Sequence, residues 1–153
     1  MERRIIKARK HTVNDVKRIL EEMDRIANTN YSRLPIKTSA RMTRALGGAV
    51  CKISERGFET KVKGLEFKFS KFFLNANLTD KDFKDIVVHE WMHIYVNELH
   101  QDDCNHDKRF KDACRKFGYA NMGGYTCSKE ISVAFTDAIK IYKAKKFENE
   151  ARG

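Results

Sequence analysis

An apolar run from residue 86 to residue 96, IVVHEWMHIYV, is interrupted only by His89, Glu90 and His93. On a helix that advances about 100° per residue, His89 and His93 lie about 40° apart, and Glu90 falls within the same arc. The rest of the surface of such a helix is apolar, so we expect the helix to be buried. Burying two imidazoles and a carboxylate without polar partners costs several kcal/mol, and a metal ion would supply such a partner.

The spacing of these three residues is HExxH. Imidazoles one helical turn apart can both bind one Zn²⁺ at about 2.0 to 2.1 Å, while the carboxylate beside the first stays off the metal and next to a bound water. The motif therefore predicts a site that activates water, with His89 and His93 as zinc ligands and Glu90 as the catalytic residue. The alternative is a chance match among core residues, and the burial of three polar groups argues against it.

A catalytic zinc ion needs a third protein ligand and keeps its fourth position open for water. We expect His106 in this role, because it opens a second amphipathic helix that can fold back on the first. Asn105 can cap that helix, Asp107 suits the positive end of its dipole, and Gly118 ends it. Its apolar face is expected to contain Phe110, Ala113, Cys114 and Phe117.

Two other histidines are weaker candidates for the third ligand. His100 lies seven residues beyond His93, which places it about 10 Å further along a helix. His11 lies in the basic N-terminal segment, where we expect a solvated histidine at the surface. His106 therefore remains the predicted ligand.

Several segments together resemble a known family. HEWMH is followed by NHDKRFKDACRKFG and preceded by SARMTRALGG and KFSKFFLNANL. This combination is similar to the SprT-like zinc metallopeptidases, which include the Spartan proteases of DNA–protein crosslink repair. The likeness covers roughly residues 38 to 119.

The resemblance implies a zincin-like α+β protease domain in which a small antiparallel sheet packs with the HExxH helix and flanking helices. It implies one Zn²⁺ held by His89, His93 and His106, with Glu90 as catalyst. Two features depart from the family pattern. Asp107 stands where the family usually has Gly, and the CxxC-type zinc ribbon that many relatives carry is not readable in this sequence.

The sequence predicts a single domain over residues 1–153, with a basic segment at 1–11, a protease core at about 12–142 and a polar tail at 143–153. Capping boxes at Thr12 and Thr79 predict helix starts, and a C-terminal amphipathic helix is expected to begin near Ser128. Residues 30–43 are expected to form a loop. Strand-like runs at 45–53, 58–62 and 65–71, separated by turn signals, predict an antiparallel meander.

An extended substrate could lie along an exposed edge strand, where main-chain hydrogen bonds make little demand on its sequence. The resemblance makes residues 65–71 our candidate for this strand, because they come just before the proposed metal helix. The alternative is an ordinary internal strand.

The four cysteines include no CxxC pair, so we expect reduced, partly buried thiols. A structural zinc site formed by Cys104, His106, Cys114 and Cys127 is the alternative, although it lacks the usual tight spacing. No signal peptide or membrane-spanning run is evident. We therefore expect a cytoplasmic protein with no membrane partner, associated with the nucleoid, or nuclear in a eukaryote.

The formal net charge is +10, from 31 Lys and Arg against 21 Asp and Glu. Such an excess favours polyanionic partners, and DNA, single-stranded or structured, is the expected one. Solvated surface charge is the alternative reading. The candidate DNA-contacting residues form an N-terminal cluster and a second cluster before the first strand: Arg3, Arg4, Lys7, Arg9, Lys10, Arg41 and Arg44.

Three hypotheses about function follow. The first is a zinc endopeptidase that acts on DNA-associated proteins, as in DNA–protein crosslink processing. The second is an HExxH peptidase that cleaves a regulatory protein. The third is a nucleic-acid-binding module with a structural zinc site, and Glu90 argues against it because a structural site has no need for that carboxylate.

Overall fold

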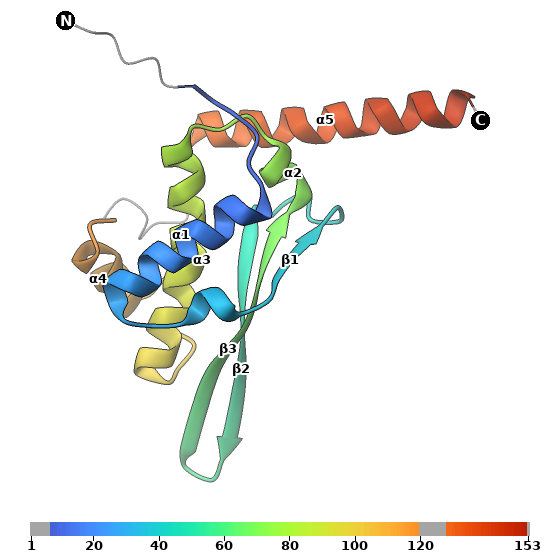
Figure 1. Ribbon diagram of the computed structural model, residues 1–153. Helices are drawn as coiled ribbons and strands as arrows, with labels where there is room; N and C mark the ends of the chain where they lie inside the picture. The colour runs from blue at the N-terminus through green and yellow to red at the C-terminus, as the bar shows by residue number, and fades with distance from the viewer. Residues whose placement is uncertain (1–6, 120–127, 153) are drawn as a thin grey trace, which may run out of the picture.

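The computed structural model describes residues 7–119 and 128–152, and Figure 1 shows their arrangement. The chain is an α+β protein in which helices pack against a small sheet. Within the described ranges, no helix is long and apolar enough to cross a membrane. The elements in chain order are α1 (Val13–Ala27), the 3-10 helix η1 (Tyr31–Arg33), β1 (Ile36–Ser39), β2 (Gly47–Arg56), β3 (Glu59–Ser70), α2 (Lys71–Asn75), α3 (Asp80–His100), α4 (Lys108–Lys116) and α5 (Lys129–Arg152).

The predicted helix starts are confirmed by their caps. The Thr12 side chain accepts a hydrogen bond from the Asp15 amide, and the Asp15 carboxylate accepts one from the Thr12 amide, so both halves of the capping box form. The Thr79 side chain caps α3 by accepting a hydrogen bond from the Asp82 amide. The Ser128 hydroxyl accepts a hydrogen bond from the Ile131 amide immediately before α5.

The predicted antiparallel meander is wrong, because the sheet is mixed. Its order is β1-β3-β2, and β1 runs parallel to β3, while β2 pairs antiparallel with β3. β1 lies within the segment that was expected to be a loop. Four residues with two exposed side chains carry almost no local strand signal, so the strand depends on pairing with residues 67–70, about thirty positions away.

β3 is one strand of 12 residues where the sequence predicted two strands with a turn at Lys63-Gly64. The pairing shifts between Val50 and Cys51, so that Leu65 is an extra residue in β3. A Cβ atom on Gly64 would lie 2.6 Å from Cγ2 of Ile94 in α3. Glycine is therefore needed here because α3 approaches closely, and no turn is required.

The position of β3 also corrects the candidate edge strand. Residues 67–69 lie between β1 and β2, and Lys71 already belongs to α2. The part of β3 beyond β1 is covered by α3: the Val62 amide donates a hydrogen bond to the Gln101 side chain, and the Gly64 amide donates one to the Glu98 carboxylate, both at 2.8 Å. The segment is therefore the internal strand that was the alternative.

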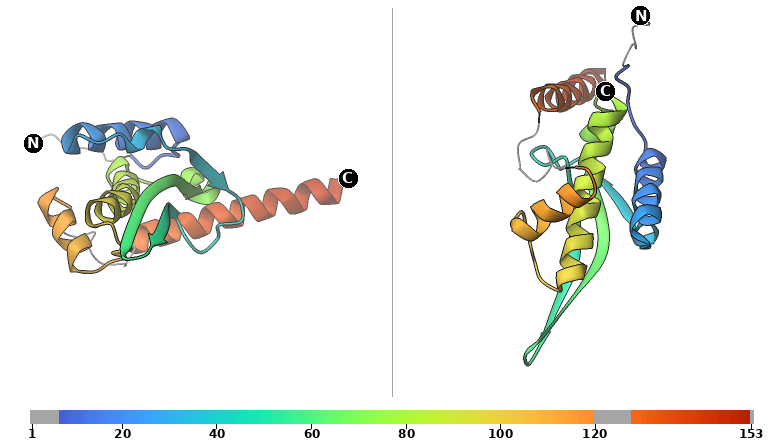
Figure 2. Two further views of the ribbon diagram at one scale, coloured as in Figure 1. Left: turned by 90° about the horizontal axis from the view of Figure 1, so that it is seen from below. Right: turned by 90° about the vertical axis from the view of Figure 1, so that its left-hand side faces the viewer.

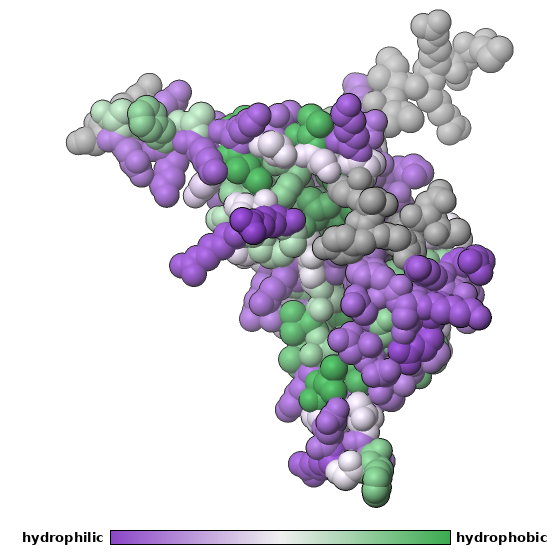
Figure 3. All heavy atoms as spheres, turned by 180° about the vertical axis from the view of Figure 1, so that it is seen from behind, coloured by the Kyte–Doolittle hydropathy of each residue, from purple (hydrophilic) through white to green (hydrophobic). Residues whose placement is uncertain are grey.

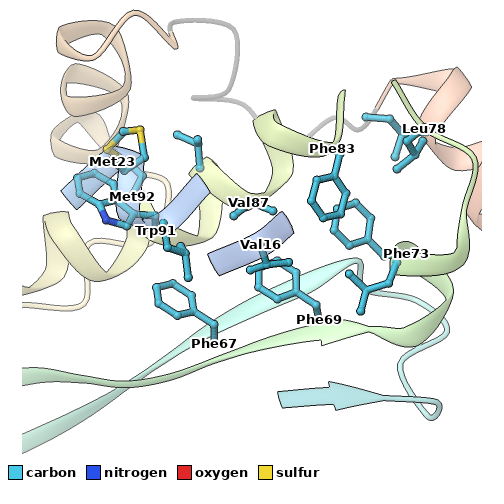
Figure 4. Packing of buried hydrophobic residues seen from close by; sticks show 14 of the residues in the cluster. Val16, Met23, Phe67, Phe69, Phe73, Leu78, Phe83, Val87, Trp91 and Met92 are labelled. Atoms are coloured by element: carbon cyan, nitrogen blue, oxygen red, sulfur yellow. The ribbon is translucent and has the colours of Figure 1, made fainter. Parts of the chain in front are cut away.

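The hydrophobic core lies between the sheet and the helices. α3 packs on β2 and β3, and α1 packs on α3, as the views in Figure 2 also show. Phe67 and Phe69 rise from β3 toward Val16 of α1 and Trp91 of α3 (Figure 4), and all four side chains are fully buried. The core therefore fixes the helix that carries His89, Glu90 and His93 against a rigid sheet.

His11 was expected at the surface and is instead buried. Its ring stacks on Phe83 with a centroid distance of 4.0 Å and an interplanar angle of 5°, and its Nε2 atom lies 2.9 Å from the Asp80 carboxylate. The cause is an isolated antiparallel bridge between Arg9 and Leu78, which holds the N-terminal segment against the start of α3. Such long-range pairing is not visible in the local sequence.

α5 continues through the segment that was expected to be a polar tail. Its first half contributes Ile131, Phe135 and Ala138 to the core, and Tyr142 contacts Phe72 of α2 edge-on at 5.2 Å. The last ten residues remain helical to Arg152 because Ala, Lys and Glu favour helix. This end of α5 projects from the body of the protein in Figure 1.

Candidate metal centre

Three histidine side chains from two parts of the chain meet beside α3. His89 and His93 lie one turn apart on this helix, with their Nε2 atoms 3.1 Å apart. His106 comes from the segment between α3 and α4, and its Nε2 atom lies 3.1 Å from that of His89. The three ligand atoms all lie within 4.8 Å of one another. The structure thus brings together the three residues that the sequence singled out.

This donor set fits a tetrahedral metal ion. Bonds of about 2.0 to 2.1 Å place neighbouring ligand atoms of such an ion about 3.3 Å apart. This value is close to the distances from the His89 Nε2 atom to those of His93 and His106. Burial, followed by the charges of His89 and His106, lowers the pKa of His93 to about 3. Burial and the nearby Lys111 lower the pKa of His106. Both rings are therefore neutral at neutral pH, which is the form that binds metal.

The segment before α4 positions His106. The N-cap of α4 is Asp107, which accepts hydrogen bonds from the Arg109 and Phe110 amides, and the expected cap at Asn105 is wrong. Asn105 has a φ angle of 49° and cannot supply the extended backbone of an N-cap. Asp107 therefore performs a capping role at the position where the family usually has Gly.

This segment is also tied back to α3 and to α4. The Cys104 amide donates a hydrogen bond of 2.9 Å to the Asn97 side chain in α3. Arg109 makes ion pairs with Asp107 at 2.6 Å and with Asp102 at 3.0 Å. These contacts hold the chain on both sides of His106, so the third imidazole has a defined position relative to the other two.

Phe110 packs against all three imidazoles. Its ring stacks on that of His93 at a centroid distance of 4.5 Å and lies 5.1 Å from His106 and 5.2 Å from His89. It is fully buried. The sequence placed Phe110 on the buried face of its helix and did not indicate this contact, because periodicity assigns a face to a residue but not its neighbours across the interface.

Glu90 follows His89 on the same helix and is 8% exposed. Burial raises the pKa of its carboxyl group to about 8. A carboxylate in such a setting takes up a proton more readily than an exposed one. The site therefore places the neutral imidazoles of His93 and His106 near a carboxyl group with a raised affinity for protons.

A buried carboxylate that no pattern in the sequence indicated supports the helix from the other side. Asp24 of α1 accepts a hydrogen bond from the Trp91 indole at 3.1 Å. It also accepts hydrogen bonds from the Thr29 hydroxyl and from the Tyr31 and Ser32 amides. The available signal was an acidic residue next to Met23, at helical spacing from Val16 and Leu20 in the segment after the Thr12 cap.

The cysteines do not form the alternative zinc site in the described residues. Cys104 and Cys114 are buried free thiols, and His106 groups with the other histidines. Burial raises the pKa of both thiols, that of Cys114 to about 11, so they remain protonated. Cys127 lies outside the described residues.

The candidate DNA-contacting residues occupy different settings. Arg3 and Arg4 lie outside the described residues, whereas Lys7, Lys10, Arg41 and Arg44 are exposed. Arg9 is held by ion pairs with Asp15 at 3.2 Å and Asp80 at 2.9 Å. Its charge is therefore engaged within the protein.

An α+β fold with three histidines converging on one helix defines a candidate metal-dependent hydrolase. The sequence model of the SprT-like family matches residues 16–134, and the chain belongs to this family. The match extends beyond the resemblance seen in the sequence and includes the whole sheet, α3 and α4. Family membership indicates a metallopeptidase-like domain. No match is found among curated proteins or among solved structures.

Proposed function

We propose that the protein is a zinc-dependent endopeptidase with a zincin-like site, in which His89, His93 and His106 hold one Zn²⁺. The observation that carries the proposal is the convergence of the three Nε2 atoms, with separations of 3.1 Å from His89, beside the buried Glu90. Membership of the SprT-like family supports the assignment.

Each of these residues has a distinct task in peptide hydrolysis. Zinc, when bound, would lower the pKa of a water molecule and polarise the scissile carbonyl. Glu90 accepts the proton of the attacking water and passes it to the leaving amine. Phe110 orders the imidazoles by packing against them, and the low pKa of His93 keeps its ring neutral, with one nitrogen unprotonated and able to bind a metal.

β2 replaces residues 65–71 as our candidate for the strand that receives substrate. Among the described residues β2 pairs only with β3, so its other edge carries no strand. Its Cys51 thiol lies 3.9 Å from the Asn97 side chain, which places β2 beside the helix that carries the histidines. An extended peptide can add to such an edge through main-chain hydrogen bonds.

The proposed substrates are proteins associated with DNA. The net charge of +10 and the exposed Arg41 and Arg44 between β1 and β2 support contact with a polyanion. Family resemblance to proteases of crosslink repair supports the same choice. Cleavage of a regulatory protein needs the zinc chemistry without the polyanion, so dependence on DNA separates the two possibilities.

A cleavage assay on a basic DNA-binding protein, with and without single-stranded DNA, tests the proposal. We expect zinc-dependent cleavage that DNA accelerates, and none with Glu90→Gln. Charge reversal at Arg41 and Arg44 should weaken the acceleration and preserve cleavage without DNA. Cleavage at the same rate with and without DNA would favour a regulatory substrate. Zinc binding without any cleavage would favour a structural site.

A further inference from the structure

The outer half of the β2–β3 hairpin has one strongly basic face. The hairpin extends beyond the helices in Figure 1 and turns at Gly57, whose φ angle is +61°. Val62 and Gly64 of β3 face α3, since Val62 is buried and a Cβ on Gly64 would meet Ile94. Side chains alternate along a strand, so Lys61 and Lys63 face the opposite side.

The pairing register places further cations on this same side. Lys52 lies directly opposite Lys63, Ser54 opposite Lys61, and Arg56 opposite Glu59. Residues directly opposite share a face, with Cβ atoms about 4.5 to 5.5 Å apart. This face, called the basic face below, therefore carries four exposed cations and one exposed acid, Glu59; the cations are Lys52, Arg56, Lys61 and Lys63.

This arrangement does not serve the stability of the sheet. Like charges directly opposite each other destabilise a strand pair, and Lys52 and Lys63 have no ion-pair partner among the described residues. Edge lysines can protect a sheet against unwanted strand addition. That explanation does not account for Lys61 and Lys63, because the side chains of Glu98 in α3 and of its C-cap Gln101 already cover the other edge of their strand. An anionic partner would relieve the repulsion.

An exposed aromatic residue lies at the tip of the same hairpin. Phe58 has a relative exposure of 111%, the highest among the exposed large apolar residues of the described chain. The turn requires Gly57 for its positive φ angle but has no need for an aromatic residue beside it. An exposed Phe side chain also favours unwanted association, which is the opposite of the protective role of edge lysines. Figure 3 shows hydrophilic and hydrophobic surface side by side at this end of the molecule.

We propose that the β2–β3 hairpin binds single-stranded nucleic acid, with Phe58 stacked on an unpaired base and the basic face in contact with phosphates. Aromatic side chains and cations combined on one surface are the usual means of binding single strands, because every unpaired base offers a ring face. A duplex hides those faces. The role of this site, which is to hold the protease on DNA, rests on the proposed function. The binding itself needs no peptidase activity.

Fluorescence anisotropy of the full-length protein with a labelled oligothymidine and a blunt duplex of equal length tests the inference. The wild type should prefer the single strand. Phe58→Ala should weaken binding by roughly 5- to 100-fold, the usual effect of removing one stacked base. Phe58→Trp should retain binding, whereas Phe58→Leu, which is apolar but lacks the ring face, should not. Ile26→Ala, at another exposed apolar residue, is the matched control.

The salt dependence tests the phosphate contacts. Lys52→Gln with Lys63→Gln should reduce the slope of log affinity against log salt by about 1.4, or about 0.7 for each lost contact to a single strand. Lys17→Gln with Arg25→Gln removes the same charge from the exposed surface of α1 and should leave the slope nearly unchanged. Unchanged thermal unfolding shows that all variants are folded.

The outcomes separate this inference from the proposed function. Wild-type affinity in Phe58→Ala and in the double lysine variant, or equal affinity for duplex and single strand, would overturn the hairpin assignment even if DNA-dependent cleavage is observed. Loss of binding in the hairpin variants would support it even if the protein cleaves nothing. Zinc content should be the same in all hairpin variants, and Phe58→Ala, which lies outside the strand proposed to receive substrate, should keep the DNA-independent cleavage of the wild type.

Discussion

The indole Nε1 of Trp91 donates a hydrogen bond of 3.1 Å to the carboxylate of Asp24, and this contact joins α1 to the helix that carries His89 and His93. Both side chains are buried. The same carboxylate accepts three further hydrogen bonds from the segment that follows α1. One acidic residue therefore sets the positions of two helices and the turn between α1 and η1.

Asp24→Ala should lower the free energy of unfolding by at least about 3 kcal/mol, because it leaves several buried donors without an acceptor. The urea midpoint measures the loss. Asp112→Ala on the exposed surface of α4 removes a weak pair with Arg115 and should change stability by no more than about 0.5 kcal/mol. Equal effects of the two substitutions would contradict a structural role for Asp24.

The stability that depends on Asp24 should vanish in acid. Burial acts to raise the pKa of Asp24, but hydrogen bonds from Thr29, Ser32 and Trp91 outweigh it, so its pKa lies below the ordinary value. A depressed pKa gives stability that is complete above the unfolded value of about 3.9 and is lost as pH falls through the folded value. The difference in stability between wild type and Asp24→Asn should therefore shrink from pH 6 toward pH 3. A constant difference would refute this.

His106→Ala should lose most of the zinc that the wild-type protein binds, which we expect to be about one equivalent. Elemental analysis of protein purified without chelators measures it. His100→Ala is the matched control, because His100 is exposed at the end of α3 and is not part of the three-histidine group. Full zinc retention in His106→Ala would place the third ligand elsewhere.

Glu90→Gln should keep its zinc and its fold while cleavage falls by at least about 100-fold, the lower limit expected for losing a general base. The substitution preserves size and removes only the ability to take a proton. Single-turnover cleavage and zinc content are measured on the same sample. An active variant would exclude Glu90 as the base, and zinc loss would make it a structural participant.

Gly64→Ala should destabilise the protein by roughly 1 to 3 kcal/mol, the usual cost of overpacking. The new methyl group would lie 2.6 Å from Ile94 Cγ2 and 3.3 Å from its Cδ1, and a β-branched side chain cannot easily move aside. Gly48→Ala on β2 is the control, since nothing lies within 4 Å of its Cβ position. Similar midpoints for the two variants would show that α3 can shift to accommodate the methyl group.

Helical periodicity was sufficient to group His89, Glu90 and His93, and the start of a second helix was sufficient to add His106.

The errors arose where contacts between distant segments decide the structure. Gly64 looks like a turn residue until α3 is placed over it, and β1 exists only because β3 is beside it. His11 became buried through the pairing of Arg9 with Leu78. Asn105 and Asp107 are both good caps, so composition alone could not choose between them. The single-domain organisation over residues 1–153 stays a prediction.

The three histidines come from two separately anchored segments, and this has a thermodynamic consequence. A metal ion that needs His106 as well as His89 and His93 can bind tightly only while α4 is docked on α3, so binding and docking are one linked equilibrium. Chelation should therefore increase the amide hydrogen exchange of α4 selectively, while the exchange of the sheet changes little. A bound metal would therefore stabilise the contact between α3 and α4 in addition to taking part in catalysis.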